Sequence, residues 1–222
     1  MIERHFDEEL SNLKRKLLKM AEVVENMIEW SIEGLKQRKE ELLNNVLEEE
    51  NQVNTFQMEI DDLALKLIAL RQPAASDLRL IISAIKINAE LERMGDQAVN
   101  IVERSLDLIK EPPLKPLIDL PRMAEITQEM VKNSIRSFVE VDSSLARNIC
   151  RQDDQVDAFN VQIFRELLTY MMQDPSNITR ALELMLVGRH LERIADHATN
   201  ICEDVVYLVE GKDVRHHIEE KE

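Results

Sequence analysis

A segment of thirteen residues in the first half of the chain returns in the second half. Residues 91–103 read LERMGDQAVNIVE and residues 191–203 read LERIADHATNICE, so eight of thirteen positions are identical at a constant offset of 100. Two unrelated helical segments of this length would share about one residue by chance. The chain is therefore two copies of one unit, and its fold must be built twice.

The repeat extends well beyond this segment. Residues 120–163 align with residues 17–60 at a constant offset of 103, which pairs Met20 with Met123 and Phe56 with Phe159. The copies are separated by a proline-rich run, and proline ends helices. We therefore assign three parts to the chain: a first unit (1–111), a linker (112–121) and a second unit (122–222).

Apolar residues recur at helical spacing in both units. Pro73 and Pro175 mark the turn before the last helix of each unit, and Ser76 or Asp77 is the expected N-cap after the first of these turns. With only four glycines and 4% aromatic residues, the chain has little material for β-turns. We predict an all-α protein of two tandem three-helix units, or six long helices, with those of the first unit at about 10–38, 39–72 and 76–110.

The repeated segment carries a Glu and an Asp four residues apart in both copies, as Glu92 with Asp96 and Glu192 with Asp196. Side chains at i and i+4 share a helix face, so two carboxylates there repel by about 0.2–0.5 kcal/mol. A cation between them would remove that repulsion, and carboxylate oxygens are the ligands of hard metal ions. The pairs are therefore candidate metal ligands.

Antiparallel helices joined by a short turn bring partners from the preceding helix level with these pairs. Counting from the two prolines sets Glu92 and Asp96 opposite Asn54 and Glu50, and the repeat alignment leads to the matching residues of the second unit. The second site has four acids and should hold two or more ions, whereas the first has one charge fewer and should bind more weakly. The candidate metal ligands are Glu50, Asn54, Glu92, Asp96, Asp153, Asp157, Glu192 and Asp196.

Other polar residues lie near these positions. Asn100, Asn200 and His197 are candidate additional ligands, although an asparagine there could equally form a hydrogen bond between helices. Arg93 and Arg193 point about 100° away from the preceding Glu, so we interpret them as ion-pair or partner-binding residues. The competing interpretation of the acids is a solvated helix face, where charges normally lie.

Composition excludes several classes of function. The net charge of −15 argues against binding nucleic acid or anionic lipid, since both present phosphate. No signal peptide and no run of about 18 apolar residues is present, so we expect a cytoplasmic protein without direct membrane insertion. Cys150 and Cys202 replace Leu47 and Val102 of the first copy, which favours core filling, with a regulatory disulfide as the alternative.

Three sets of residues together match a known family. They are the two Leu-Glu-Arg-x-x-Asp-x-Ala-x-Asn-Ile segments, the opening Arg4-His5-Phe6, and the run from Pro73 to Ile82 with Asp77-Leu78-Arg79. In these residues the chain resembles the PhoU family of phosphate-signalling regulators over essentially its whole length. The resemblance implies two three-helix bundles related by pseudo-twofold symmetry, with a Glu/Asp-x-x-x-Asp motif on two helices of each bundle. It implies multinuclear iron clusters or other divalent or trivalent ions (Mn, Mg, Zn or Ca) at those motifs, from which Asn54 departs.

The same resemblance implies a role. Its members are cytoplasmic, often homodimeric adaptors between the high-affinity phosphate ABC transporter and a sensor histidine kinase, and they reach the inner membrane through these partners. By this analogy the chain is a metal-binding negative regulator of the phosphate-starvation response, acting in signal transduction and phosphate homeostasis.

Two other functions compete with that one. A carboxylate-bridged ion store or oxidase of the ferritin-like kind places Glu-x-x-His motifs on its helices, and no Glu in this sequence is followed by His three residues later. A purely structural helical scaffold would show no effect of metal on its melting. We find neither a nucleophile paired with a base nor a Gly-rich phosphate loop, so we expect no enzyme.

Overall fold

The computed structural model describes residues 2–211, which form helices and connecting turns and contain no strand. The predicted all-α fold of two repeated units is confirmed; His216 and His217 of the tail lie outside the described residues. The elements are α1 (Ile2–Gln37), α2 (Glu40–Arg71), α3 (Ala75–Leu108), α4 (Asp119–Glu140), α5 (Ser143–Cys150), α6 (Asp153–Gln173), the short 3₁₀ helix η1 (Pro175–Asn177) and α7 (Ile178–Glu210).

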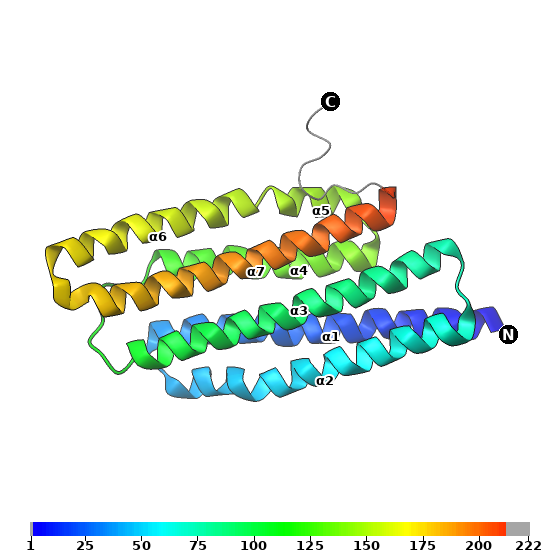
Figure 1. The fold of residues 1–222 in the computed structure, drawn as a ribbon, viewed down its shortest axis with the longest axis horizontal. Helices are drawn as coiled ribbons and strands as arrows, with labels where there is room; N and C mark the ends of the chain where they lie inside the picture. Colours follow the sequence, from blue (N-terminus) through cyan, green and yellow to red (C-terminus); the bar gives the residue numbers. More distant parts are fainter. Residues whose placement is uncertain (1, 212–222) are drawn as a thin grey trace, which may run out of the picture.

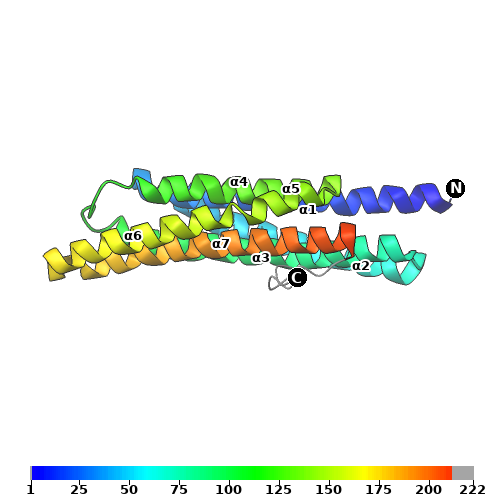
Figure 2. The ribbon, with the colours of Figure 1, turned by 90° about the horizontal axis from the view of Figure 1, so that it is seen from above.

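The helices lie in two layers (Figures 1 and 2). Helices α2, α3, α7 and α6 run side by side in one layer, and α1 and α4 form the other. Helices α1 to α3 make the first bundle and α4 to α7 the second, and the bundles meet where α3 packs on α7 and α1 packs on α4. No helix within residues 2–211 is long and apolar enough to cross a membrane.

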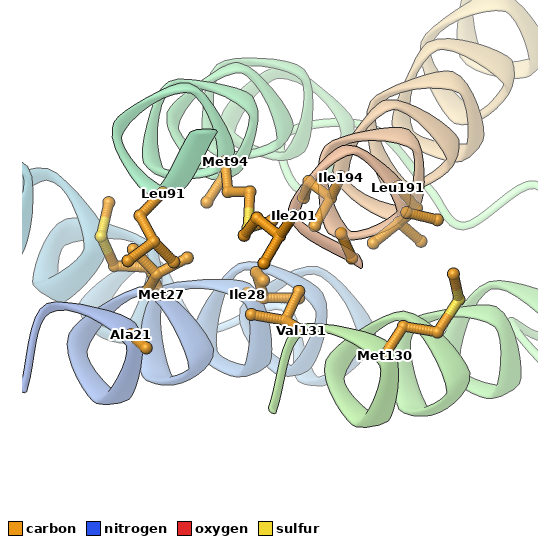
Figure 3. Packing of buried hydrophobic residues seen from close by; sticks show 14 of the residues in the cluster. Ala21, Met27, Ile28, Leu91, Met94, Met130, Val131, Leu191, Ile194 and Ile201 are labelled. Carbon is orange, nitrogen blue, oxygen red and sulfur yellow. The ribbon is translucent and has the colours of Figure 1, made fainter. Parts of the chain in front are cut away.

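A single apolar core runs through both bundles (Figure 3). Met94 of α3 and Ile194 of α7 face each other above Ile28 of α1 and Val131 of α4, and all four side chains are buried. Burying a side chain of this size stabilises the folded state by about 1.5–3 kcal/mol. Separating the bundles would therefore expose apolar side chains of both and lower the stability of each.

Polar contacts line the junction of α3 and α7, which we call the seam. The Nδ1 of His197 donates to Glu90 Oε2 at 2.6 Å, and the Nδ1 of His190 donates to Gln97 Oε1 at 2.8 Å. At the repeat offset of 100, positions 90 and 190 are equivalent, as are 97 and 197. The two contacts are therefore the same contact made in both directions, which places a pseudo-twofold axis between Arg93 and Met94 of α3 and the matching residues of α7.

The turn after the first helix of each bundle is also duplicated. Arg38 and Val141, equivalent at the offset of 103, both adopt left-handed backbone with φ of 58° and 56°. The next residue then closes the turn: Lys39 N donates to Gly34 O, and Asp142 N to Ser137 O, each at 2.9 Å. The repeat is thus visible in the backbone as well as in the sequence.

The structure departs from the predicted helices in four places. Helix α1 begins at Ile2, whereas the apolar spacing predicted a start near residue 10. The fifth helix is divided at residues 151–152 into α5 and α6, whereas its counterpart α2 is continuous. Helix α3 begins after Ala74 instead of at Ser76 or Asp77. Helix α4 begins at Asp119, so Pro121 lies in its first turn, where a missing N–H costs nothing, and not in the linker.

Candidate metal centre

Asp153 is the most perturbed carboxyl of the second bundle. It is the first residue of α6, directly after the break in the helix, and its Oδ1 is buried without a hydrogen-bond partner. Burial, followed by the charges of Asp157, Asp196, Asp154 and Glu192, raises the pKa of Asp153 to about 7. The structure therefore brings the predicted carboxylates of the second bundle within electrostatic reach of one another.

Asp196 is exposed on α7 and lies within electrostatic reach of Asp153 and Asp157. Burial of part of its side chain raises its pKa, and Asp157 of α6 adds to the increase, against the opposing charges of Arg189 and His197. Asp157 is itself exposed. The two aspartates thus lie at the surface edge of the α6–α7 pair, free to turn, while Asp153 lies deeper.

Glu192 is held by other groups. Asn160 Nδ2 donates to its Oε2 at 3.1 Å, and the guanidinium of Arg189 forms an ion pair with the same oxygen. Asn160 lies almost one turn further along α6 than Asp157, the partner that the sequence predicted. Sequence analysis missed Asn160, although it belongs to the same face of α6 as Asp153 and Asp157.

The predicted carboxylates of the first bundle influence one another less than those of the second. Burial raises the pKa of Glu92, and Asp96 raises it further, whereas the charges of Arg93 and His197 lower it. All the groups acting on Glu92 therefore lie on α3 or α7. Glu50 and Asn54 of α2, which the sequence predicted opposite Glu92 and Asp96, are half-buried.

Several of the additional candidate residues form contacts with Glu90 in the seam between α3 and α7. His197 and Asn200 donate to the same oxygen of Glu90, at 2.6 and 3.1 Å, and Arg93 pairs with its other oxygen at 2.9 Å. Burial acts to raise the pKa of Glu90, but these hydrogen bonds outweigh it and the net shift is downward. Arg193 is exposed and Asn100 is half-buried.

Glu90 itself was missed from the sequence. Its signal was available, because an acid at position 90 matches a histidine at the equivalent position 190. That exchange of a carboxylate for an imidazole fits the seam contacts, because Glu90 accepts from His197 whereas its equivalent His190 donates to Gln97.

The predicted carboxylates are the right kind of ligand for a cation, but their side chains are not arranged around one point. Over residues 2–211, no three His, Cys, Asp or Glu side chains are arranged to hold one metal ion. Asp153 nevertheless offers a buried oxygen with no donor, beside acids that raise its pKa. The chemistry of the second bundle therefore suits a hard cation, since carboxylate oxygens are the ligands that such ions take.

Comparison with known proteins decides the family. The PhoU domain model matches twice, at residues 17–105 and 120–205, one match for each repeat. The chain belongs to the PhoU family. Among its relatives, the phosphate-specific transport system accessory protein PhoU homologue of Aquifex aeolicus is 44% identical over 96% of this chain and 97% of its own length.

Solved PhoU structures share the fold. The crystal structure of PhoU from Pseudomonas aeruginosa matches with a TM-score of 0.89 at 38% identity, covering 93% of this chain and all of that one. The phosphate transport system regulatory protein PhoU of Streptococcus pneumoniae matches with a TM-score of 0.86 at 28% identity, covering 94% of this chain and 99% of that one. These relatives carry the names of accessory and regulatory proteins, which agrees with the prediction of a non-enzyme.

Proposed function

We propose that the protein is an accessory protein of phosphate-specific transport and a negative regulator of the phosphate-starvation response. The observation that carries this proposal is the match to PhoU proteins along almost the whole chain, in both repeats. The names of the relatives supply the link to phosphate transport. A short shared motif would have supported the fold alone.

The proposal includes a cation bound by the second bundle. Asp153, Asp157, Glu192 and Asp196 would supply the oxygens, and the first bundle, where Asn54 replaces a carboxylate, would bind more weakly. The donor set suits iron, manganese, magnesium or calcium, and an all-carboxylate site suits zinc less. Bound charge would neutralise the acids and hold α6 against α7.

The proposed partners are a phosphate ABC transporter and a sensor histidine kinase, and the outer face of the seam is the proposed docking surface. Arg93 and Arg193 are exposed there on either side of the pseudo-twofold axis, next to the exposed Asp96 and Asp196. A surface with both signs of charge favours specific orientation of a protein partner. We also propose a homodimer, which light scattering of the purified protein tests directly.

Complementation tests the proposed role. The chain would be expressed in a bacterium that lacks its own PhoU protein and carries a reporter under a phosphate-starvation promoter. We expect the chain to restore repression in phosphate-rich medium. Replacement of Arg93 and Arg193 by Gln should weaken repression with little change in Tm, because both side chains are exposed and the pair of Arg93 with Glu90 lies at the surface.

A reporter that stays fully active although the folded chain accumulates would argue against the role. Repression that the double arginine variant retains in full would remove the proposed docking surface and leave the regulatory role standing. Replacement of the exposed Arg136 of α4, which lies away from the seam, is the matched control.

A further inference from the structure

The two cysteines of the chain meet across α5 and α7. Cys150 is the last residue of α5 and is half-buried, whereas Cys202 lies within α7 with no exposed surface. Both are free thiols, and each is the main influence on the pKa of the other. Residues 52 positions apart in the sequence therefore lie close together where α5 packs on α7.

Packing alone does not require sulfur at these positions. The first bundle has Leu47 and Val102 at the equivalent places, and Val102 is as deeply buried there as Cys202 is here. An apolar pair thus satisfies the same helix contact. The core-filling interpretation explains why a cysteine is tolerated at either position, but not why both positions carry one.

The chain next to Cys150 is also less regular than its counterpart. Helix α2 continues past Leu47, whereas the second bundle breaks at residues 151–152 directly after Cys150. The Gln152 Oε1 and Asp153 Oδ1 atoms are both buried without hydrogen-bond partners. A break with unsatisfied groups can shift at lower cost than a continuous helix, which leaves room for the end of α5 to move toward α7.

The two thiols differ in pKa, and Cys150 is the one that ionises more readily. The interaction with Cys202 lowers the pKa of Cys150, in spite of its partial burial. The same interaction and full burial raise the pKa of Cys202 well above its ordinary value. The accessible sulfur is thus the more readily ionised, and oxidants attack an accessible thiolate first.

We propose that Cys150 and Cys202 are a dithiol site that peroxides convert reversibly into an intramolecular disulfide. The Cys150 thiolate attacks hydrogen peroxide; an S–O bond forms, the O–O bond breaks, and the leaving hydroxide takes up the proton that the thiol released, which gives a sulfenic acid and one water. The Cys202 sulfur then attacks the Cys150 sulfur; the S–S bond forms, the S–O bond breaks, and hydroxide leaves as a second water with the Cys202 proton. A low-molecular-weight thiol reduces the disulfide by exchange.

The proposal stands apart from the metal centre. The disulfide would fix the end of α5 to α7 one helical turn before Asp153, but its formation needs neither a metal nor a partner. The site gives the second bundle, and not the first, a pair of thiols that an oxidant can link. The first bundle provides the internal comparison, because its equivalent side chains cannot be oxidised in this way.

Peroxide treatment of the purified, metal-free chain tests the site. Free thiols would be titrated and the intact mass measured before and after treatment, with peptide mapping and a non-reducing gel. We expect loss of both thiols, a mass lower by two hydrogen atoms, a Cys150–Cys202 peptide pair in the monomer band, and recovery of both thiols with glutathione. In Cys202→Ser, Cys150 should instead gain an oxygen, and in Cys150→Ser the remaining thiol should react at least about tenfold more slowly.

The thiol-free variant Cys150→Leu/Cys202→Val carries the residues of the first bundle and controls for folding, checked by circular dichroism. It should be folded and form no disulfide, and any oxygen that it gains on peroxide treatment should map to exposed methionines such as Met58 and Met172. Persistence of both thiols in the treated wild type, oxygen addition at each cysteine without a bond between them, or a disulfide found only between two chains would each overturn the proposal.

Discussion

At the scale of single residues, the clearest signature of the site is a carboxyl that the fold does not stabilise. The pKa of Asp153 lies at about 7 instead of 3.8, because burial and the neighbouring acids disfavour its charge. The folded chain therefore holds this proton more tightly than the unfolded chain does. The penalty is absent below the unfolded pKa, grows as the pH rises, and is complete above about pH 7.

Asp153→Asn should therefore stabilise the metal-free protein at alkaline pH. A shift of this size corresponds to about 4 kcal/mol, and solvent screening of a half-exposed group reduces it to about 1–2 kcal/mol. Urea unfolding in the presence of a chelator should show this gain near pH 8 and almost none near pH 4. Glu50→Gln, the matching change on α2, is the control; an equal gain in both variants would contradict the account.

His190 should give the opposite pH dependence. Burial, followed by the charges of Arg193 and Arg104, lowers its pKa from 6.5 to about 4. The unfolded chain then binds a proton that the folded chain does not, so stability falls as the pH drops from 6.5 toward 4. His190→Gln should lose about 1 kcal/mol less than the wild type between pH 7 and 5, after the same allowance for exposure. Parallel stability profiles for the two proteins would refute this.

The sequence revealed the carboxylates but not their surroundings. The i, i+4 spacing and the repeat predicted Asp153, Asp157, Glu192 and Asp196, and the structure brings their charges within reach of one another. Neither signal could show that Asn160 and Arg189 already hold Glu192, because both contacts depend on side-chain conformation. Periodicity likewise could not separate a ligand from a seam residue, and so His197 and Asn200 were grouped with the acids.

At the scale of helices, the same turn is capped in one copy and not in the other. Asp142 accepts hydrogen bonds from the backbone N–H groups of Ser144 and Leu145, at 2.9 and 3.0 Å. Lys39 occupies the equivalent position before α2 with similar extended backbone and makes no side-chain cap. The repeat therefore contains its own experiment on the strength of an N-cap.

Asp142→Ala should destabilise the protein by about 1 kcal/mol, and Lys39→Asn should stabilise it by a smaller amount, both through the first N–H groups of the helix. Thermal unfolding of the two variants and the wild type measures both effects. A neutral result for Asp142→Ala together with a loss for Lys39→Asn would show that the two turns are not equivalent.

The sequence predicted where helices occur better than where they end. Apolar spacing and the prolines located every helix, because both signals act along the chain. The division between α5 and α6 carried no such signal: residues 151–152 include neither proline nor glycine, and α2 continues through the equivalent position. The periodicity of apolar residues in one helix therefore could not locate that break.

At the scale of the whole molecule, the bundles share a core and a seam. Residues from both bundles meet at Met94 and Ile194 (Figure 3), and the ion pairs of Lys86 with Asp204 and Arg104 with Glu183 close the ends of the seam. The sequence showed two units joined by a linker, which alone would suit two independent domains. Only the structure shows how closely the units associate.

We therefore predict that the two bundles unfold together. Calorimetry of the intact chain should give one transition whose calorimetric and van't Hoff enthalpies agree. Met94→Ala, which leaves a cavity at the junction, should lower the free energy of unfolding by about 2–5 kcal/mol and so lower the Tm of that single transition. Two resolved transitions, with only one of them affected by the substitution, would show that the bundles are independent.

The central claim is that the acids of the second bundle bind a cation. Titration calorimetry of metal-free protein with Mn²⁺ tests it most directly, on the wild type, Asp153→Asn/Asp196→Asn, and the first-bundle control Glu92→Gln/Asp96→Asn. We predict saturable binding by the wild type and the control, and affinity at least about 100-fold lower in the Asp153/Asp196 variant, since both of its changes remove ligands. Equal binding by all three proteins, or no binding by any, would contradict the claim.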